Sequence, residues 1–163
     1  MVGASQLTVR TRGLTIAVAA VLLAAVVWAQ TPTTINDLTF GNVFPGIPKE
    51  IDKKAAGSAA EFSISGTPGE EVLINFTLPT HMTSGSNRLL MVFADTSCAA
   101  DSADPADQSN PTWDDQDPRQ TITATLGSAG LTVWLGSEVI PNQLQESGSY
   151  TGEIVIFVTA SGT

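Results

Sequence analysis

The chain is predicted to be all-β, with a single Ig-like β-sandwich of about seven or eight strands after a cleaved signal peptide. Apolar residues mostly alternate with polar ones in short runs that are rich in β-branched and aromatic side chains. Clusters of Gly, Pro, Ser and Asn separate these runs. No stretch after residue 29 shows a helical period of comparable strength. A β-barrel is the main alternative.

The alternation also predicts where the strands lie. Within residues 71–78, Val72, Ile74 and Phe76 fall on one face, so a shift of one residue would expose them all. The run over residues 150–159 is apolar on both faces, which is typical of a central strand. The predicted strands cover residues 38–43, 60–65, 71–78, 89–94, 120–126, 131–135 and 150–159, with a weaker candidate at 49–53.

The amino-terminal residues have the pattern of a secretory signal. Arg10 and Arg12 precede the uncharged run Leu14–Val27, and small residues follow it. That run has 14 residues, whereas a helix needs about 20 to cross a bilayer. Cleavage is therefore predicted between Ala29 and Gln30. The domains are then a signal peptide at 1–29 and a β-sandwich domain at 30–163, which places the protein in the secreted, periplasmic or outer cell-surface compartment.

The charge of the chain excludes one class of partner. The whole chain has 7 basic and 16 acidic residues and a net charge of -9, and removal of residues 1–29 leaves -11 because only Arg10 and Arg12 are lost. A protein of this charge repels phosphate backbones and anionic lipids, so no nucleic acid partner is expected. The only cysteine, Cys98, is far from the predicted cleavage site, and the carboxyl terminus is not an apolar tail. No permanent membrane anchor is therefore expected.

One segment departs from the strand pattern. Residues 95–119, here called the acidic loop, contain seven aspartates and three prolines, and loops of this length are often functional. Carboxylates on a flexible loop are ligands that Ca²⁺ prefers, although no EF-hand pattern is present. A solvated loop that keeps the protein soluble is the alternative. The candidate calcium ligands are Asp101, Asp104, Asp107, Asp114, Asp115 and Asp117.

Two tryptophans suggest carbohydrate binding, because aromatic faces stack on sugar rings. Trp113 lies in the acidic loop, and Trp134 lies in a predicted strand with an outward position in its alternating run. Ordinary packing of both side chains is the alternative, with Trp113 attaching the loop to the sandwich.

Catalysis has little support, and the protein is predicted not to be an enzyme. His81 is the only histidine, and no G-x-S-x-G motif accompanies it, so an exposed turn position is expected. Cys98 cannot form an internal disulfide, and its acidic neighbours should raise the pKa of its thiol. It could still join two chains through an intermolecular disulfide.

Three stretches resemble an uncharacterised family of bacterial secreted β-sandwich domains, which is distantly similar to spore coat protein U and secreted pilus subunits. Residues 38–43 are similar to its L-x-F-G opening, residues 60–69 to its F-x-V-x-G-x-P-G segment, and residues 131–159 to its closing L-x-V-x-G, Pro and G-x-Y-x-G-x-V pattern. The resemblance implies a surface or periplasmic protein in a pilus or biofilm matrix, and it implies no catalytic residues. A typical pilus subunit differs in having a longer amino-terminal extension and a disulfide.

These observations together predict a noncatalytic secreted or surface-associated structural or adhesive protein, such as a pilus-like or biofilm-matrix component. Its expected partners are further copies of itself or other surface proteins. The alternative function is a Ca²⁺-dependent or carbohydrate-binding module that uses the acidic loop.

Overall fold

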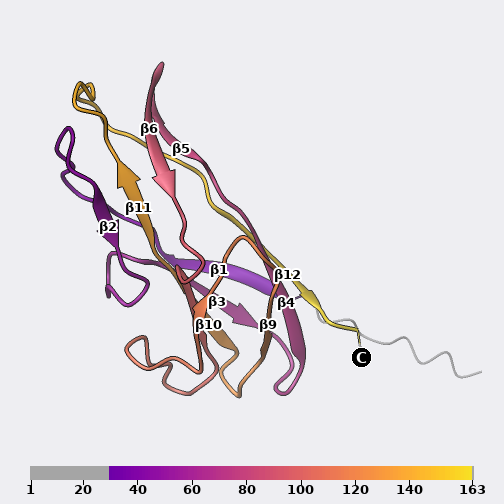
Figure 1. Cartoon of the computed structure of the whole chain (residues 1–163). Coiled ribbons are helices and arrows are strands. Elements are labelled where there is room, and N and C mark those ends of the chain that lie inside the picture. The colour runs from indigo at the N-terminus through magenta and orange to yellow at the C-terminus, as the bar shows by residue number, and fades with distance from the viewer. Residues whose placement is uncertain (1–29, 163) are drawn as a thin grey trace, which may run out of the picture.

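The chain is all-β, as its sequence predicts (Figure 1). The computed structural model describes residues 30–162, in which twelve strands form three antiparallel sheets and no helix is present. This part of the chain consequently has no helix long and apolar enough to cross a membrane. The predicted signal peptide, residues 1–29, lies outside the described residues.

The sheets differ in size and are named A, B and C. Sheet A has the order β1 (Thr31–Asn36), β3 (Ala60–Ser65), β10 (Leu131–Leu135), β7 (Cys98–Asp101) and β8 (Trp113–Gln116). Sheet B has the order β2 (Lys49–Ile51), β11 (Ser137–Ile140), β6 (Asn87–Val92) and β5 (His81–Ser84). Sheet C has the order β12 (Val155–Ala160), β4 (Glu71–Thr77) and β9 (Ile122–Thr125).

Sheets A and C pack face to face around the main core, in a β-sandwich-like arrangement. Ile64 of β3 and Val133 of β10 have no solvent exposure, and neither has Ile74 of β4 on the opposing sheet. The rings of Phe62 and Phe76 bridge the two sheets with their centroids 6.1 Å apart. This core is continuous with the inner face of sheet B.

Two short connections lead from the sandwich into sheet B, which extends the molecule at one end (Figure 1). β4 leads into β5, and β10 leads into β11 with only Gly136 between them. A Cβ atom at Gly136 would lie 2.4 Å from the carbonyl oxygen of Ile51 and 2.6 Å from the amide nitrogen of Lys53. Glycine is therefore required where the chain changes sheet.

Most of the predicted strands are confirmed. Those at 60–65 and 131–135 have the predicted bounds, and those at 71–78, 89–94, 120–126 and 49–53 are shifted or shortened by a few residues. The alternation in β4 is also confirmed, because Val72 and Ile74 are fully buried and Phe76 packs against the core.

The prediction for the amino-terminal strand is wrong. Residues 38–43 form no strand, and the strand lies instead at β1, just before them. β1 pairs with β3 at the edge of sheet A, where Pro32 is tolerated because one side of an edge strand needs no backbone donors. Leu38, Phe40 and Val43 still pack against the core, although their backbone has no partner strand.

The acidic loop is not a single long loop. It contains β7 and β8, which leaves only residues 102–112 as the connection between two strands of sheet A. The sequence signal for β7 is weak, because its residues are Cys98, Ala99, Ala100 and Asp101. β5 and β11 are likewise absent from the predicted strands.

The last strand is shorter than predicted and is not central. β12 begins at Val155, after an isolated bridge between Thr83 and Thr151, and it lies at the edge of sheet C. Its outward residue Phe157 is 54% exposed. The two apolar faces of the sequence therefore do not indicate burial on both sides.

Candidate functional site

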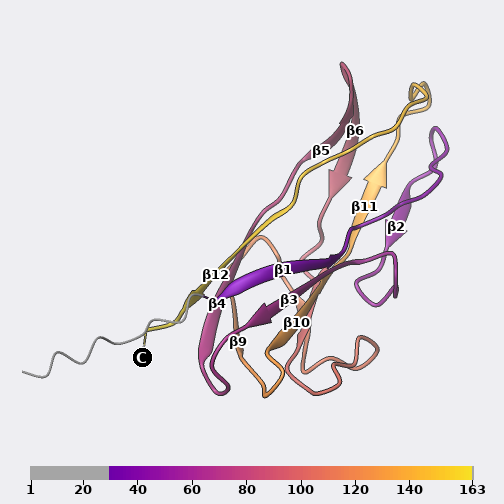
Figure 2. The ribbon, with the colours of Figure 1, turned by 180° about the vertical axis from the view of Figure 1, so that it is seen from behind.

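A groove opens where the two layers of the sandwich separate. β1 and β12 lie in contact, but the segment that follows β1 (residues 37–45) and the one that precedes β12 (residues 145–154) diverge toward sheet B (Figure 2). The two segments flank a cavity of about 990 Å³ that is open to solvent. At the far end they meet again, because the amide of Gly46 donates a 3.0 Å hydrogen bond to the carbonyl of Asn142.

The interior of the groove is apolar. Most of its floor is the inner face of sheet B, where Leu89 and Met91 of β6 and Met82 of β5 line it. Phe62 of β3, in sheet A, completes the floor. The flanking segments contribute further apolar side chains. These are Leu38, Phe40, Val43, Phe44, Tyr150 and Ile154.

The backbone of the two flanking segments is largely unpaired. Thr39 donates to Ser58, and Thr151 exchanges two hydrogen bonds with Thr83. Within the described residues, the backbone groups of 147–150 and 152–154 make no other hydrogen bond to backbone, and neither do those of Leu38, Phe40 or Val43. Most main-chain donors and acceptors of the two flanking segments are thus not paired with other backbone of the described residues.

The rim of the groove is acidic. Asp37 and Glu146 line it, and of the described residues no lysine, arginine or histidine does. Tyr150 has a fixed position, since its hydroxyl donates to the carbonyl of Glu146 at 2.8 Å and accepts from Gln145 at 2.7 Å. Phe44, at the mouth, is 64% exposed. A neutral or basic ligand with apolar side chains would match this surface.

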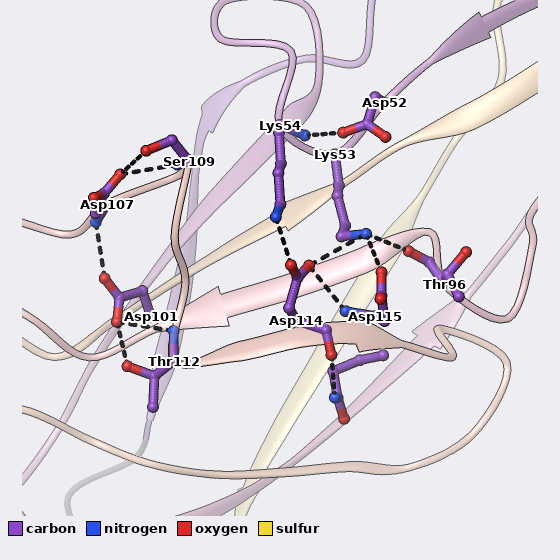
Figure 3. Close-up of polar contacts among 11 residues, drawn as sticks. Asp52, Lys53, Lys54, Thr96, Asp101, Asp107, Ser109, Thr112, Asp114 and Asp115 are labelled. Atoms are coloured by element: carbon purple, nitrogen blue, oxygen red, sulfur yellow. Dashed lines mark hydrogen bonds and ion pairs between the residues drawn. The ribbon is translucent and has the colours of Figure 1, made fainter.

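Hydrogen bonds and ion pairs hold the acidic loop in place, and the first set of them centres on Asp101 (Figure 3). This carboxylate is 2% exposed, and it accepts hydrogen bonds from the amides of Ala103, Asp107 and Thr112 and from the hydroxyl of Thr112. Burial opposes its ionisation, but these donors outweigh burial and lower the pKa of Asp101. Asp101 therefore holds residues 103–112 against sheet A.

A second set of bonds surrounds the buried Lys53 (Figure 3). Its ammonium group lies 2.7 Å from Asp115 and 3.3 Å from Asp114, and it donates to the carbonyl of Thr96 at 2.8 Å. Burial lowers the pKa of Lys53, but its bonds to both aspartates outweigh burial and raise it. Lys54 pairs with Asp114 from the other side and lowers the pKa of that carboxyl. This network attaches β8 to the segment after β2.

The remaining candidate ligands are dispersed. Asp117 pairs with Arg119 at 2.8 Å, and the Asp107 carboxylate accepts from the amide and hydroxyl of Ser109. Asp104 is exposed on the turn before Pro105. Among residues 30–162, no three His, Cys, Asp or Glu side chains are grouped so that they could hold a metal ion. This arrangement gives no support to the predicted calcium site.

The two tryptophans are not both available to a sugar. Trp134 is 3% exposed, so its predicted outward orientation is correct only in that it lies on the face opposite the core. There it shares its face with Ala99, which is also buried. Trp113 of β8 is half-buried and packs against the core cluster, as expected for a side chain that attaches the acidic loop.

His81 and Cys98 both lie in strands. His81 begins β5 rather than lying in a turn, and its Nδ1 lies 3.0 Å from the hydroxyl of Thr80. Cys98 is fully buried in β7, and burial raises the pKa of its thiol to about 12. The predicted direction is right, but burial rather than acidic neighbours is the cause. A disulfide to another chain would require the core to open.

Sequence reasoning missed the groove as a site. The alternating Leu38 and Phe40 were a usable signal for inward-facing side chains, and Tyr150 and Ile154 give a similar signal near the other end of the chain. What the pattern lacks is any sign that these two segments would fail to pair with a neighbouring strand.

No family model matches the chain, and no curated protein matches it at a significant level.

Proposed function

We propose that this protein is a noncatalytic, surface-associated structural or adhesive protein that binds an extended segment of a partner polypeptide in the groove. The observation that carries the proposal is the apolar floor flanked by two segments whose backbone groups are largely unpaired with other backbone. An added strand would satisfy those groups and would place alternate side chains on the floor. The signal pattern and the resemblance to secreted β-sandwich domains support a role outside the cytoplasm.

The expected affinity follows from the size of the groove. A bound strand of about five residues directs two or three side chains inward, and each contributes about 1.5–3 kcal/mol when buried. Backbone hydrogen bonds add about 0.5–1.5 kcal/mol each. Ordering and association oppose these terms by several kcal/mol. We therefore expect micromolar binding of a single peptide, with tighter attachment where several copies act together.

Gly152 allows a direct test, because it lies in the groove wall. A Cβ atom there would meet Met82 and Pro79 at 3.5 Å, which is ordinary contact. Gly152→Ala should therefore leave the groove open, whereas the larger side chain of Gly152→Leu should obstruct the part of it beside Met82. Peptides selected from a random display library against the wild-type protein should lose at least tenfold in affinity for Gly152→Leu and keep it for Gly152→Ala.

Hydrogen exchange locates the bound peptide. On binding, amide exchange should slow in residues 38–43 and 147–154 and should not change in β7 or β8. The proposal would be wrong if no peptide bound the wild-type protein at millimolar concentration. It would also be wrong if bound peptides slowed amide exchange in other segments and bound Gly152→Leu with unchanged affinity.

A further inference from the structure

The outer face of sheet B has an apolar centre between two charged ends. Register places Leu90 of β6 beside Ile140 of β11, and Val92 beside Glu138. Leu90, Val92 and Ile140 are 40%, 38% and 36% exposed. Their neighbours Leu89, Met91 and Val139 point the opposite way, into the core. This outward apolar cluster is thus contiguous across two central strands.

The charges on this face are separated along the strand direction. Glu138 lies beside Val92 at one end of the face, and Glu50 of β2 lies beside Glu138. Arg88 lies four residues before Val92, at the other end, beside Thr83 of β5. Four residues of strand span about 13 Å. No salt bridge within residues 30–162 involves Arg88, Glu138 or Glu50.

We propose that the outer face of sheet B binds a second copy of this chain, face to face about a two-fold axis. The axis lies between the two copies of sheet B, runs perpendicular to the strands and passes near Leu90 and Ile140. This rotation places the Arg88 end of each copy over the Glu138 end of the other. Two equivalent Arg88–Glu138 pairs then flank a centre made of Leu90 and Ile140 from both copies. The surface is on the opposite side of sheet B from the groove, so this inference does not depend on the proposed function.

Charge complementarity identifies a second copy as the partner. The face is self-complementary, because one rotation brings each charged end over its opposite. Sheets that pack face to face lie about 10 Å apart, a gap that Arg and Glu side chains can bridge. The overall negative charge opposes association, but at physiological ionic strength it is screened beyond about 8 Å. Contacts at the face itself are screened less.

The face is small, which determines how strong the association should be. Four strands about 4.8 Å apart and four or five residues long cover roughly 300 Å² in each copy. Stable interfaces bury about 800 Å² per partner. We therefore expect a reversible, concentration-dependent dimer rather than a permanent one. On a cell surface, where copies are confined, such contacts would act in large numbers.

Sedimentation equilibrium of the purified protein over about a hundredfold range of concentration tests the proposal. The average mass should rise from monomer toward dimer. Arg88→Glu and Glu138→Arg should each weaken association at least tenfold, because each change places like charges opposite one another. An equimolar mixture of the two variants should associate like the wild type, since every facing pair in the mixed dimer then joins an acidic side chain to a basic one. The double variant, which keeps the net charge, should also associate.

Controls separate this surface from general effects. Thr125→Glu adds a negative charge on the exposed side of β9 in sheet C and should leave association unchanged. Gly152→Leu, which obstructs part of the groove, should leave association unchanged as well. Thermal melts should show that all variants fold. A wild-type protein that stays monomeric at the highest concentration would overturn the proposal, and so would a mixture of the two single variants that stays monomeric.

Discussion

At the scale of single residues, Asp101 shows how a carboxylate that resembles a metal ligand can have a structural role. Its side chain is almost fully buried, and four hydrogen-bond donors from residues 103, 107 and 112 surround it. Hydrogen bonds to a charged acceptor are stronger than those to a neutral one. A buried carboxylate with this many donors stabilises the surrounding chain without a cation.

Asp101→Ala should destabilise the protein by about 2–3 kcal/mol, because it removes a charged acceptor and leaves several donors without a partner. Chemical denaturation followed by tryptophan fluorescence would measure the loss. Asp95→Ala, in the same acidic loop but exposed, should change stability by no more than about 0.5 kcal/mol. Equal effects of the two substitutions would contradict the role assigned to Asp101.

Residue types alone did not reveal these roles. The six candidate aspartates are conspicuous in the sequence, but a carboxylate is equally suited to Ca²⁺, to lysine or to backbone amides. The choice depends on what lies within about 3 Å, and Lys53 is 61 residues before Asp114 in the chain. Such long-range pairs cannot be read from local patterns.

At the scale of secondary-structure elements, the strands that were predicted correctly are those whose alternation is strongest. β3 and β10 combine β-branched and aromatic residues with full burial of one face. β7 and β8 contain alanines and aspartates, and they form strands because β7 pairs with the edge of β10 and β8 pairs in turn with β7. β1 likewise depends on β3, which overrides the weak propensity of its own sequence.

Thr33→Pro should disrupt β1. Pro32 lies opposite Ile64, and proline has no amide hydrogen to donate to the partner strand. Hydrogen-bonded and non-hydrogen-bonded pairs alternate along an antiparallel ladder, so the next pair, Thr33 with Ser63, is a hydrogen-bonded one. A proline at Thr33 removes a ladder donor, so stability should fall by about 1–2 kcal/mol.

Hydrogen exchange would follow this change through faster exchange of the β3 amides from 61 to 65, together with a lower melting temperature. Thr33→Ala keeps the donor and serves as the matched control. If the alanine variant exchanged as fast as the proline variant, backbone pairing would not be the main role of β1.

At the scale of the whole molecule, the distribution of charge predicts how stability depends on pH. Hydrogen bonds and ion pairs lower the pKa values of Asp101, Asp107, Asp114 and Asp117 in the folded state. Their stabilising contribution is therefore complete above the unfolded value of about 3.9 and is lost as the pH falls through the lower folded values. Lys53 has a raised pKa, so its contribution is lost only at high pH.

Thermal melts between pH 7 and pH 2 should thus show little change down to about pH 5 and a marked fall in melting temperature below about pH 4. An amide side chain does not ionise, so the Asp101→Asn variant should lose less stability over the same pH interval. A melting temperature that stayed constant down to pH 2 would contradict the roles given to these carboxylates. Added Ca²⁺ should not raise the melting temperature at pH 7, because five of the six candidate carboxylates already have a partner in the protein and are not grouped around one point.

The all-β class and the residues on the inner faces of the main strands could be predicted from the sequence alone. This is because the side-chain period of a strand is local and is visible in any alternating run. The separation of residues 37–45 and 145–154, which leaves the groove, became visible only in the folded chain. The same holds for the pairing of the acidic-loop aspartates with Lys53, Lys54 and backbone amides. Both outcomes depend on contacts between residues far apart in the chain, and local periodicity carries no information about such contacts.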